Sequence, residues 1–125
     1  MKAVLDAGAL VAVERRDRHV GALLRVLQQR RVPLWTSAAV LAQVWRDGAR
    51  QATLARLLQG VGVRPLAMDD GKQAGALLGS TGTDDVVDAH LALLLEAGDR
   101  VLTSDSDDVL RLLAARRVRA IVVPI

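Results

Sequence analysis

The sequence predicts an α/β fold, a three-layer sandwich with a central, mostly parallel sheet of about five strands between helices. Short apolar runs alternate with longer segments of helical periodicity along the 125 residues. This strand–helix alternation indicates parallel strands joined by right-handed crossovers, with helices on both faces. No linker, low-complexity tract or repeat interrupts the pattern, and the length suits one core. We therefore expect a single domain over residues 1–125.

The first half of the chain carries clear element boundaries. An apolar run at 2–6 is interrupted by Ala7-Gly8, which is typical of a short buried strand. Apolar residues recur at i, i+3, i+4 and i+7 from Val20 to Leu27, which indicates an amphipathic helix. Thr36 or Ser37 can cap a further helix. The elements expected are a strand at 2–6, a helix to Glu14, a helix around 20–27, a strand at 33–35, a helix to about Arg46, a helix at 51–59 and a strand at 60–66.

The second half repeats the alternation. Asp69 or Asp70 can cap a helix that reaches about Leu78, and Gly79 to Thr83 reads as a loop. Gly98 is placed to end the next helix. The remaining elements expected are a helix from near Asp85 to Ala97, a strand at 100–103, a helix from Asp105 to Ala115 and a strand at 119–123.

Composition excludes several functions. The chain has no cysteine, so disulfides, thiolate chemistry and cysteine zinc sites are excluded. Phe and Tyr are absent, which argues against an aromatic platform for stacked bases. No apolar run reaches the roughly 18–20 residues of a membrane span, and the start does not read as a signal peptide. We expect a cytoplasmic protein. The net charge of +3 permits a nucleic-acid partner without requiring one.

Acidic residues gather where parallel strands end. Asp6 ends the first strand, Asp105 follows the fourth, and Asp88 lies at the start of the preceding helix. Asp85 shares a helix face with Asp88, three residues away. Because the reactive crevice of such folds lies at the carboxyl ends of the strands, these carboxylates are expected to meet there.

Clustered carboxylates repel one another unless a positive charge offsets them. A divalent cation does so, and oxygen-only ligands suit Mg²⁺ or Mn²⁺. An all-acid site of this kind favours hydrolysis of phosphodiesters. Helix capping is the alternative for each acid, and it is the stronger interpretation for Asp69, Asp70, Asp84 and Asp107. Which of Asp85, Asp107 and Asp108 joins the site is left open.

Other catalytic groups lack a suitable context. His19 and His90 are interpreted as surface residues, and His90 should point away from Asp88. The serines lack a nucleophile-elbow context, and no glycine-rich phosphate loop with a lysine is present. A receiver-like phosphorylation domain would need an aspartate after the third strand and a lysine after the fifth, and the sequence has neither.

Three segments in order resemble the PIN-domain family, in particular VapC-like toxin ribonucleases. They are Val4-Leu5-Asp6-Ala7-Gly8-Ala9-Leu10, Asp88-Ala89-His90-Leu91-Ala92 and Val101-Leu102-Thr103-Ser104-Asp105. The resemblance implies catalytic metal ligands at Asp6, Asp88 and Asp105, with Thr103 in support, and cleavage of RNA with Mg²⁺ or Mn²⁺. It also implies a homodimer and an antitoxin protein whose tail occupies the active-site groove.

One position departs from that family. Gln43 stands where the family's second acid, a glutamate, is expected, and an amide keeps a carbonyl oxygen but loses the charge. Asp85 could supply the missing carboxylate. Alternatively, the chain is a catalytically weakened binding or regulatory module.

Arginines could contribute to substrate binding. They are 15 of the 17 basic residues, since the only lysines are Lys2 and Lys72. Arg15, Arg16 and Arg46 are expected to border the groove and to contact RNA phosphates.

Overall fold

The computed structural model describes residues 1–125 as a five-stranded sheet with seven helices. The elements run, in chain order, β1 Ala3–Leu5, α1 Ala7–Glu14, α2 Arg18–Gln29, β2 Leu34–Ser37, α3 Ala38–Val44, α4 Ala52–Leu58, β3 Val61–Arg64, α5 Met68–Thr81, α6 Val86–Leu93, β4 Arg100–Thr103, α7 Ser106–Arg116 and β5 Ile121–Pro124. The predicted α/β class is confirmed. All strand pairs are parallel.

The strand order β3-β2-β1-β4-β5 determines where a site can form. From β1 the chain adds β2 and β3 on one side, and then β4 and β5 on the other. The order therefore reverses between β1 and β4, which opens a crevice at the carboxyl ends of these two strands. Val4 pairs with Val101 and Leu5 with Leu102, so the residues that follow both strands emerge side by side.

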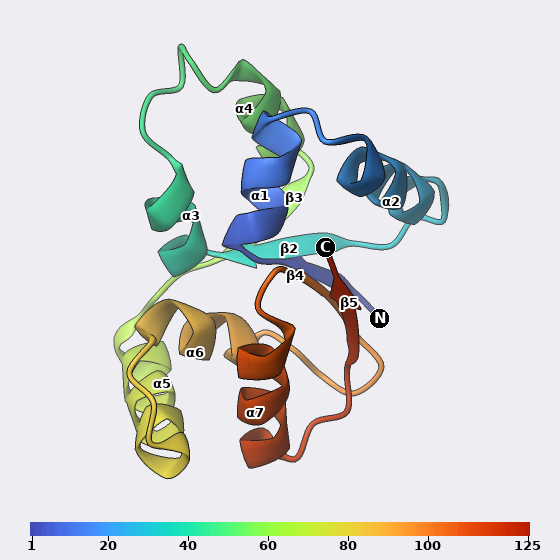
Figure 1. The fold of residues 1–125 in the computed structure, drawn as a ribbon. Coiled ribbons are helices and arrows are strands. Elements are labelled where there is room, and N and C mark those ends of the chain that lie inside the picture. Colours follow the sequence, from blue (N-terminus) through green and yellow to red (C-terminus); the bar gives the residue numbers. More distant parts are fainter.

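Helices cover both faces of the sheet (Figure 1). α1, α2 and α4 lie on one side, and α5, α6 and α7 lie on the other. The central strand β1 is fully buried, as expected for a strand covered on both faces. A cluster of 19 buried residues forms around it, and a smaller cluster of six packs α5 against α6 and α7. None of the helices is both long and apolar enough to cross a bilayer.

Two helix ends differ from the sequence prediction. α5 continues to Thr81 through the segment expected to be a loop, and the Ser80 and Thr81 hydroxyls donate to the Leu77 carbonyl within the helix. Gly82, in the left-handed conformation, then ends the helix. α6 is shorter than expected and ends at Leu93 instead of Ala97.

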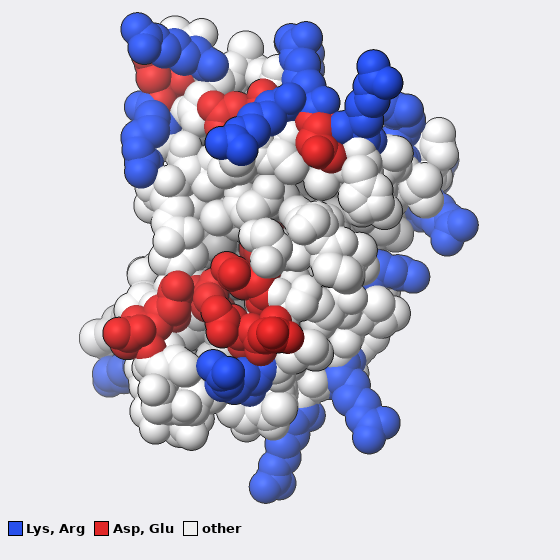
Figure 2. All heavy atoms as spheres, viewed as in Figure 1, with Lys and Arg blue, Asp and Glu red and all other residues white.

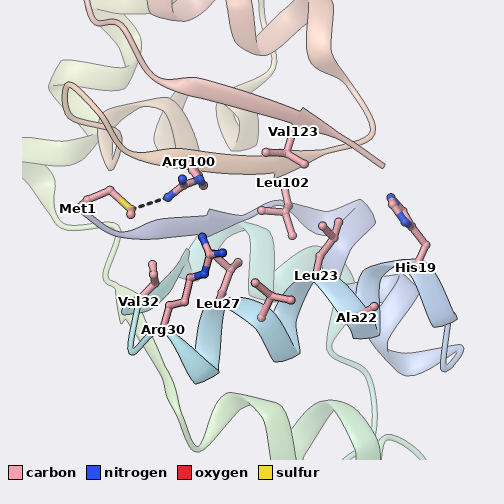
Figure 3. Close-up of a pocket in the computed structure, with 11 residues that line it drawn as sticks. Met1, His19, Ala22, Leu23, Leu27, Arg30, Val32, Arg100, Leu102 and Val123 are labelled. Carbon is pink, nitrogen blue, oxygen red and sulfur yellow. Dashed lines mark hydrogen bonds between the residues drawn. The ribbon is translucent and has the colours of Figure 1, made fainter.

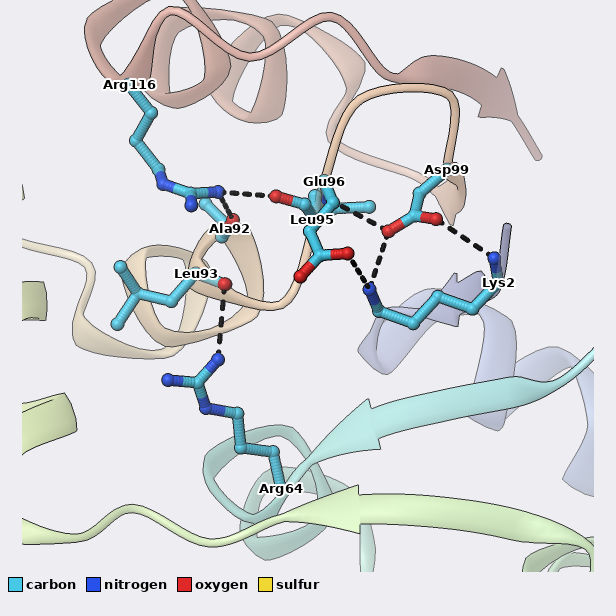
Figure 4. Close-up of polar contacts among 8 residues, drawn as sticks. All are labelled: Lys2, Arg64, Ala92, Leu93, Leu95, Glu96, Asp99 and Arg116. Carbon is cyan, nitrogen blue, oxygen red and sulfur yellow. Dashed lines mark hydrogen bonds and ion pairs between the residues drawn. The ribbon is translucent and has the colours of Figure 1, made fainter.

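The early end of α6 has a physical reason in two arginines, shown in Figure 4. Arg116 of α7 donates to the carbonyls of Ala92 and Leu95, and Arg64 of β3 donates to the carbonyl of Leu93 at 3.3 Å. These guanidinium groups satisfy carbonyls that a continuing helix would otherwise pair with its own N–H groups. Helix α6, with Asp88 in its first turn, is thereby fixed at its far end.

An ion pair ties the start of β1 to the start of β4 (Figure 4). The Nζ atom of Lys2 lies 2.6 Å from the buried Asp99 carboxylate, which also accepts from the backbone N–H groups of Lys2 and Glu96. Burial by itself would raise the pKa of Asp99, but these hydrogen bonds and the Lys2 charge outweigh it and lower the pKa. The contact holds together the two strands that flank the crevice.

Candidate functional site

Three carboxylates converge at the crevice. Oxygens of Asp88, Asp105 and Asp108 all lie within 4.8 Å of one another. Two of the three belong to the set predicted from the sequence, and Asp108 is one of the acids that the sequence left open. They come from the starts of two neighbouring helices, α6 and α7, which pack against each other.

Local structure keeps the Asp105 carboxylate free. Asp105 is the residue before the first turn of α7, yet its side chain makes no capping hydrogen bond. Its backbone N–H donates instead to the buried Thr103 hydroxyl at 2.9 Å. Thr103 thus fixes the turn after β4, and the Asp105 side chain remains available to a ligand.

Asp6 lies beside this trio and is held rigidly. Its carboxylate accepts from the Ala9 N–H at 2.9 Å and from the Ser104 N–H at 3.1 Å, so it bridges the ends of β1 and β4. Asp6 is only 6% exposed. A side chain at Gly8 would lie 2.9 Å from the Ser104 Cβ and 3.2 Å from an Asp6 oxygen. The glycine is therefore needed for the two loops to approach.

The acids act on one another electrostatically. The pKa of Asp88 is raised from 3.8 to about 6, first by burial and then by the charges of Asp85, Asp105, Asp108 and Asp6. The negative charge of Asp6 therefore helps to raise the pKa of Asp88, although its contribution is the smallest of those named. A cation in the midst of these acids would relieve the repulsion.

The cluster opens to solvent through two hollows. One, of about 250 Å³, is lined by Asp84, Asp85, Asp88, Asp108 and Arg111 among others, and one of about 380 Å³ by residues 104–108. Figure 2 shows the resulting acidic patch over the starts of α6 and α7. Arg111, 3.6 Å from Asp108, is the one basic residue in either lining.

Other predicted residues lie outside the trio. Asp85 caps α6 by accepting from the Asp88 N–H at 2.9 Å, so one of its oxygens is already used. Gln43, in α3, is exposed, and its side chain forms no hydrogen bond. It is not among the residues that line the acidic hollows.

The three predicted RNA-contacting arginines are not at the acidic hollows either. Arg15 and Arg16 follow the end of α1, whereas Asp6 precedes its start. The Arg46 guanidinium folds back onto the carbonyls of Ala42 and Trp45, at 3.0 and 2.6 Å.

The position of His90 differs from the sequence prediction of a surface residue. The ring is fully buried instead of lying at the surface, and neither nitrogen has a hydrogen-bond partner. Burial lowers its pKa, with the Arg64 charge acting in the same direction and Asp70 against it. Residues 89–95 are all buried because α6 is covered by the sheet, α5 and α7. The sequence feature that indicates this burial is the apolar run around His90, because consecutive apolar residues place apolar side chains on every face of the helix.

A third hollow is apolar and separate from the acids. It has a volume of about 480 Å³ and lies between α2 and the strands β4 and β5 (Figure 3). Leu23, Leu27, Leu102 and Val123 contribute to its floor and walls, with Arg30 and Arg100 at its side. No carboxylate lines it.

Comparison with known proteins shows shared architecture at low identity. No protein-family model matches the chain, and no curated protein matches it. The crystal structure of VapBC2 from Rickettsia felis, bound to a DNA fragment from the promoter, matches with a TM-score of 0.69 and 15% identity, over 100% of this chain and 99% of that chain. The structure of FitAcB from Neisseria gonorrhoeae matches with a TM-score of 0.61 and 14% identity, over 95% and 96%.

These findings overturn the family assignment made from the three motifs. The matching structures are of the complexes VapBC2 and FitAcB, and at 14–15% identity they support the fold of a chain in such a complex. They do not identify this chain as a PIN-domain, VapC-like toxin, and the motifs alone are too short to do so. The functional argument therefore starts from the geometry of the acidic site.

Proposed function

We propose that the chain is a metal-dependent endoribonuclease that hydrolyses RNA phosphodiesters at the acidic crevice. The observation that carries this proposal is the convergence of Asp88, Asp105 and Asp108 within 4.8 Å at the point where the strand order reverses. Carboxylates placed so close together are costly unless a cation binds them.

The donor set fits Mg²⁺ or Mn²⁺. All three side chains offer carboxylate oxygens, no cysteine exists in the chain, and both histidines are absent from the cluster. Asp88, Asp105 and Asp108 would hold the cation, with Asp6 completing the negative charge around it. A bound divalent cation supplies Lewis acidity at a phosphodiester and a source of activated water.

The remaining residues of the site position these ligands. Asp6 locks the β1 end to the β4 end through two backbone N–H groups, and Thr103 fixes the turn that carries Asp105. Arg111 sits where a substrate phosphate would approach the acids, and its guanidinium is suited to contact that phosphate. Its pairing with Asp108 is exposed and therefore weak enough to be exchanged for a phosphate.

The structural likeness to VapBC2 and FitAcB favours a toxin–antitoxin setting for this activity. In that setting the chain is the nuclease, and a cognate antitoxin protein binds it and blocks the crevice. We also propose that the chain forms a homodimer, as most small oligomeric proteins do.

Cleavage of a quenched fluorescent RNA tests the proposal. We expect cleavage with Mn²⁺ or Mg²⁺, none in EDTA, and a loss of at least a hundredfold in Asp105→Asn. Asp107→Asn, a neighbouring acid outside the trio, is the matched control and should retain activity. Equal activity of wild type and Asp105→Asn would refute the assignment. Mn²⁺ binding without any cleavage of RNA would favour a binding or regulatory module instead.

A further inference from the structure

A further hollow, of opposite charge to the acidic site, lies at the other end of α1. It has a volume of about 780 Å³ and is formed by the α1–α2 turn, α2 and α4. Four arginines from these three elements line it: Arg16, Arg18, Arg25 and Arg56. Figure 2 shows that Lys and Arg side chains gather over this end of the molecule, apart from the main acidic patch. We call this surface the arginine groove.

The arginine groove carries a net positive charge, four arginines against one aspartate. All four arginines are exposed, and none of them forms an ion pair or a side-chain hydrogen bond. Asp17 is the one acid in the lining, and one of its oxygens already accepts from the Val20 N–H at 2.9 Å to cap α2. Four like charges around one hollow repel each other, which favours binding of a polyanion.

We propose that the arginine groove binds the phosphate backbone of single-stranded RNA. Guanidinium groups bind phosphates bidentately, and Gln28 and Thr53 add neutral hydrogen-bonding groups to the lining. No aromatic side chain is present for base stacking, so binding is insensitive to sequence and depends on phosphate charge.

The position of the groove fits a substrate that also reaches the acids. Helix α1 has eight residues and is therefore about 12 Å long. Asp6 precedes its first residue, and Val13, near its last, lines the groove. A segment of a few nucleotides is long enough to span that distance. The identification of RNA as the occupant rests on the proposed function, because an acidic polypeptide is the other polyanion such a surface could take.

Fluorescence anisotropy of a labelled 12-nucleotide RNA, measured in EDTA, separates binding from cleavage. We expect Arg25→Glu and Arg56→Glu each to weaken RNA binding at least tenfold and to make the salt dependence less steep by about 0.7 per lost contact. Arg119→Glu, in the α7–β5 loop, makes the same change of charge at an exposed arginine outside the groove and should weaken binding less than threefold. Thermal unfolding of each variant checks that it folds.

Three outcomes overturn the proposal. They are unchanged binding in Arg25→Glu and Arg56→Glu, an equal loss in Arg119→Glu, and a 12-residue polyglutamate that binds more tightly than RNA through the same arginines. Asp105→Asn should retain RNA binding in EDTA while losing cleavage. If wild type binds RNA through the groove but never cleaves it, the proposed function fails and the groove assignment stands.

Discussion

Replacing Asp88 by asparagine should stabilise the protein while it destroys metal binding. In the folded protein the pKa of Asp88 is about 6, compared with 3.8 for an unperturbed aspartate. The folded state therefore holds a proton more tightly than the unfolded chain. Between about pH 4 and 6 the free energy of unfolding must fall as pH rises, because the Asp88 carboxylate ionises against burial and its neighbours' charges.

The magnitude follows from the shift. About two pKa units correspond to an upper limit of about 3 kcal/mol at 1.36 kcal/mol per unit. Asp88 is partly exposed, so solvent screening reduces this to about 1–2 kcal/mol. Loss of a favourable negative charge in the first turn of α6 costs about 0.5 kcal/mol in the opposite direction. The net expectation for Asp88→Asn at pH 7.5 is a gain of about 1 kcal/mol.

Urea unfolding in EDTA at pH 4, 5, 6 and 7.5 measures this effect. The difference between Asp88→Asn and wild type should be near zero or slightly negative at pH 4, rise through pH 5–6 and level off above pH 7. With saturating Mn²⁺ the order should reverse, since only wild type gains binding free energy in the folded state. Asp107→Asn, whose charge is not among those that raise the pKa of Asp88, is the control. A difference independent of pH would refute the reasoning.

Three further predictions concern the surroundings of the site. Gly8→Ala should lower the free energy of unfolding by about 1–3 kcal/mol and weaken Mn²⁺ binding, because the added methyl displaces Ser104 from Asp6. Urea unfolding measures the first effect and calorimetric titration the second. An unchanged Mn²⁺ affinity would count against the role given to Asp6. Gln43→Glu should change the Mn²⁺ affinity by less than about threefold, because the exposed Gln43 side chain does not line the acidic hollows and solvent screens the added charge; a tenfold tightening measured by calorimetry would place residue 43 at the site. Light scattering at micromolar concentration should give a dimer mass, since Met68 and Leu66 are exposed apolar side chains at 78% and 44%; a monomer mass would contradict this.

The architecture could be predicted because periodicity and strand ends are local signals. The alternation of apolar runs with helical segments gave every strand and helix in order, and Asp6, Asp88 and Asp105 were placed at the crevice by the rule for parallel sheets. Contacts between residues distant in the chain could not be predicted from the sequence. The early end of α6 depends on Arg64 and Arg116, which are distant in sequence.

Two features of the site also depend on contacts between residues that are distant in sequence or on opposite ends of a helix. Three acids, Asp105, Asp107 and Asp108, occur at the start of α7, and helical spacing alone does not say that Asp108 joins Asp88 while Asp107 does not. Arg16 was expected at the acidic groove, but helix α1 separates it from Asp6 and places it in the arginine groove. Membership of a family, unlike these geometric points, could not be settled by three short motifs.

The central claim is that Asp88, Asp105 and Asp108 bind one divalent cation. Anomalous diffraction from a crystal soaked in Mn²⁺ tests it directly, because the metal is located independently of any assay of activity. We predict one strong anomalous peak with oxygens of all three carboxylates about 2.0–2.4 Å away, the range of Mg²⁺- and Mn²⁺-type sites. No peak at the crevice, or a peak elsewhere with this trio unliganded, would contradict the account.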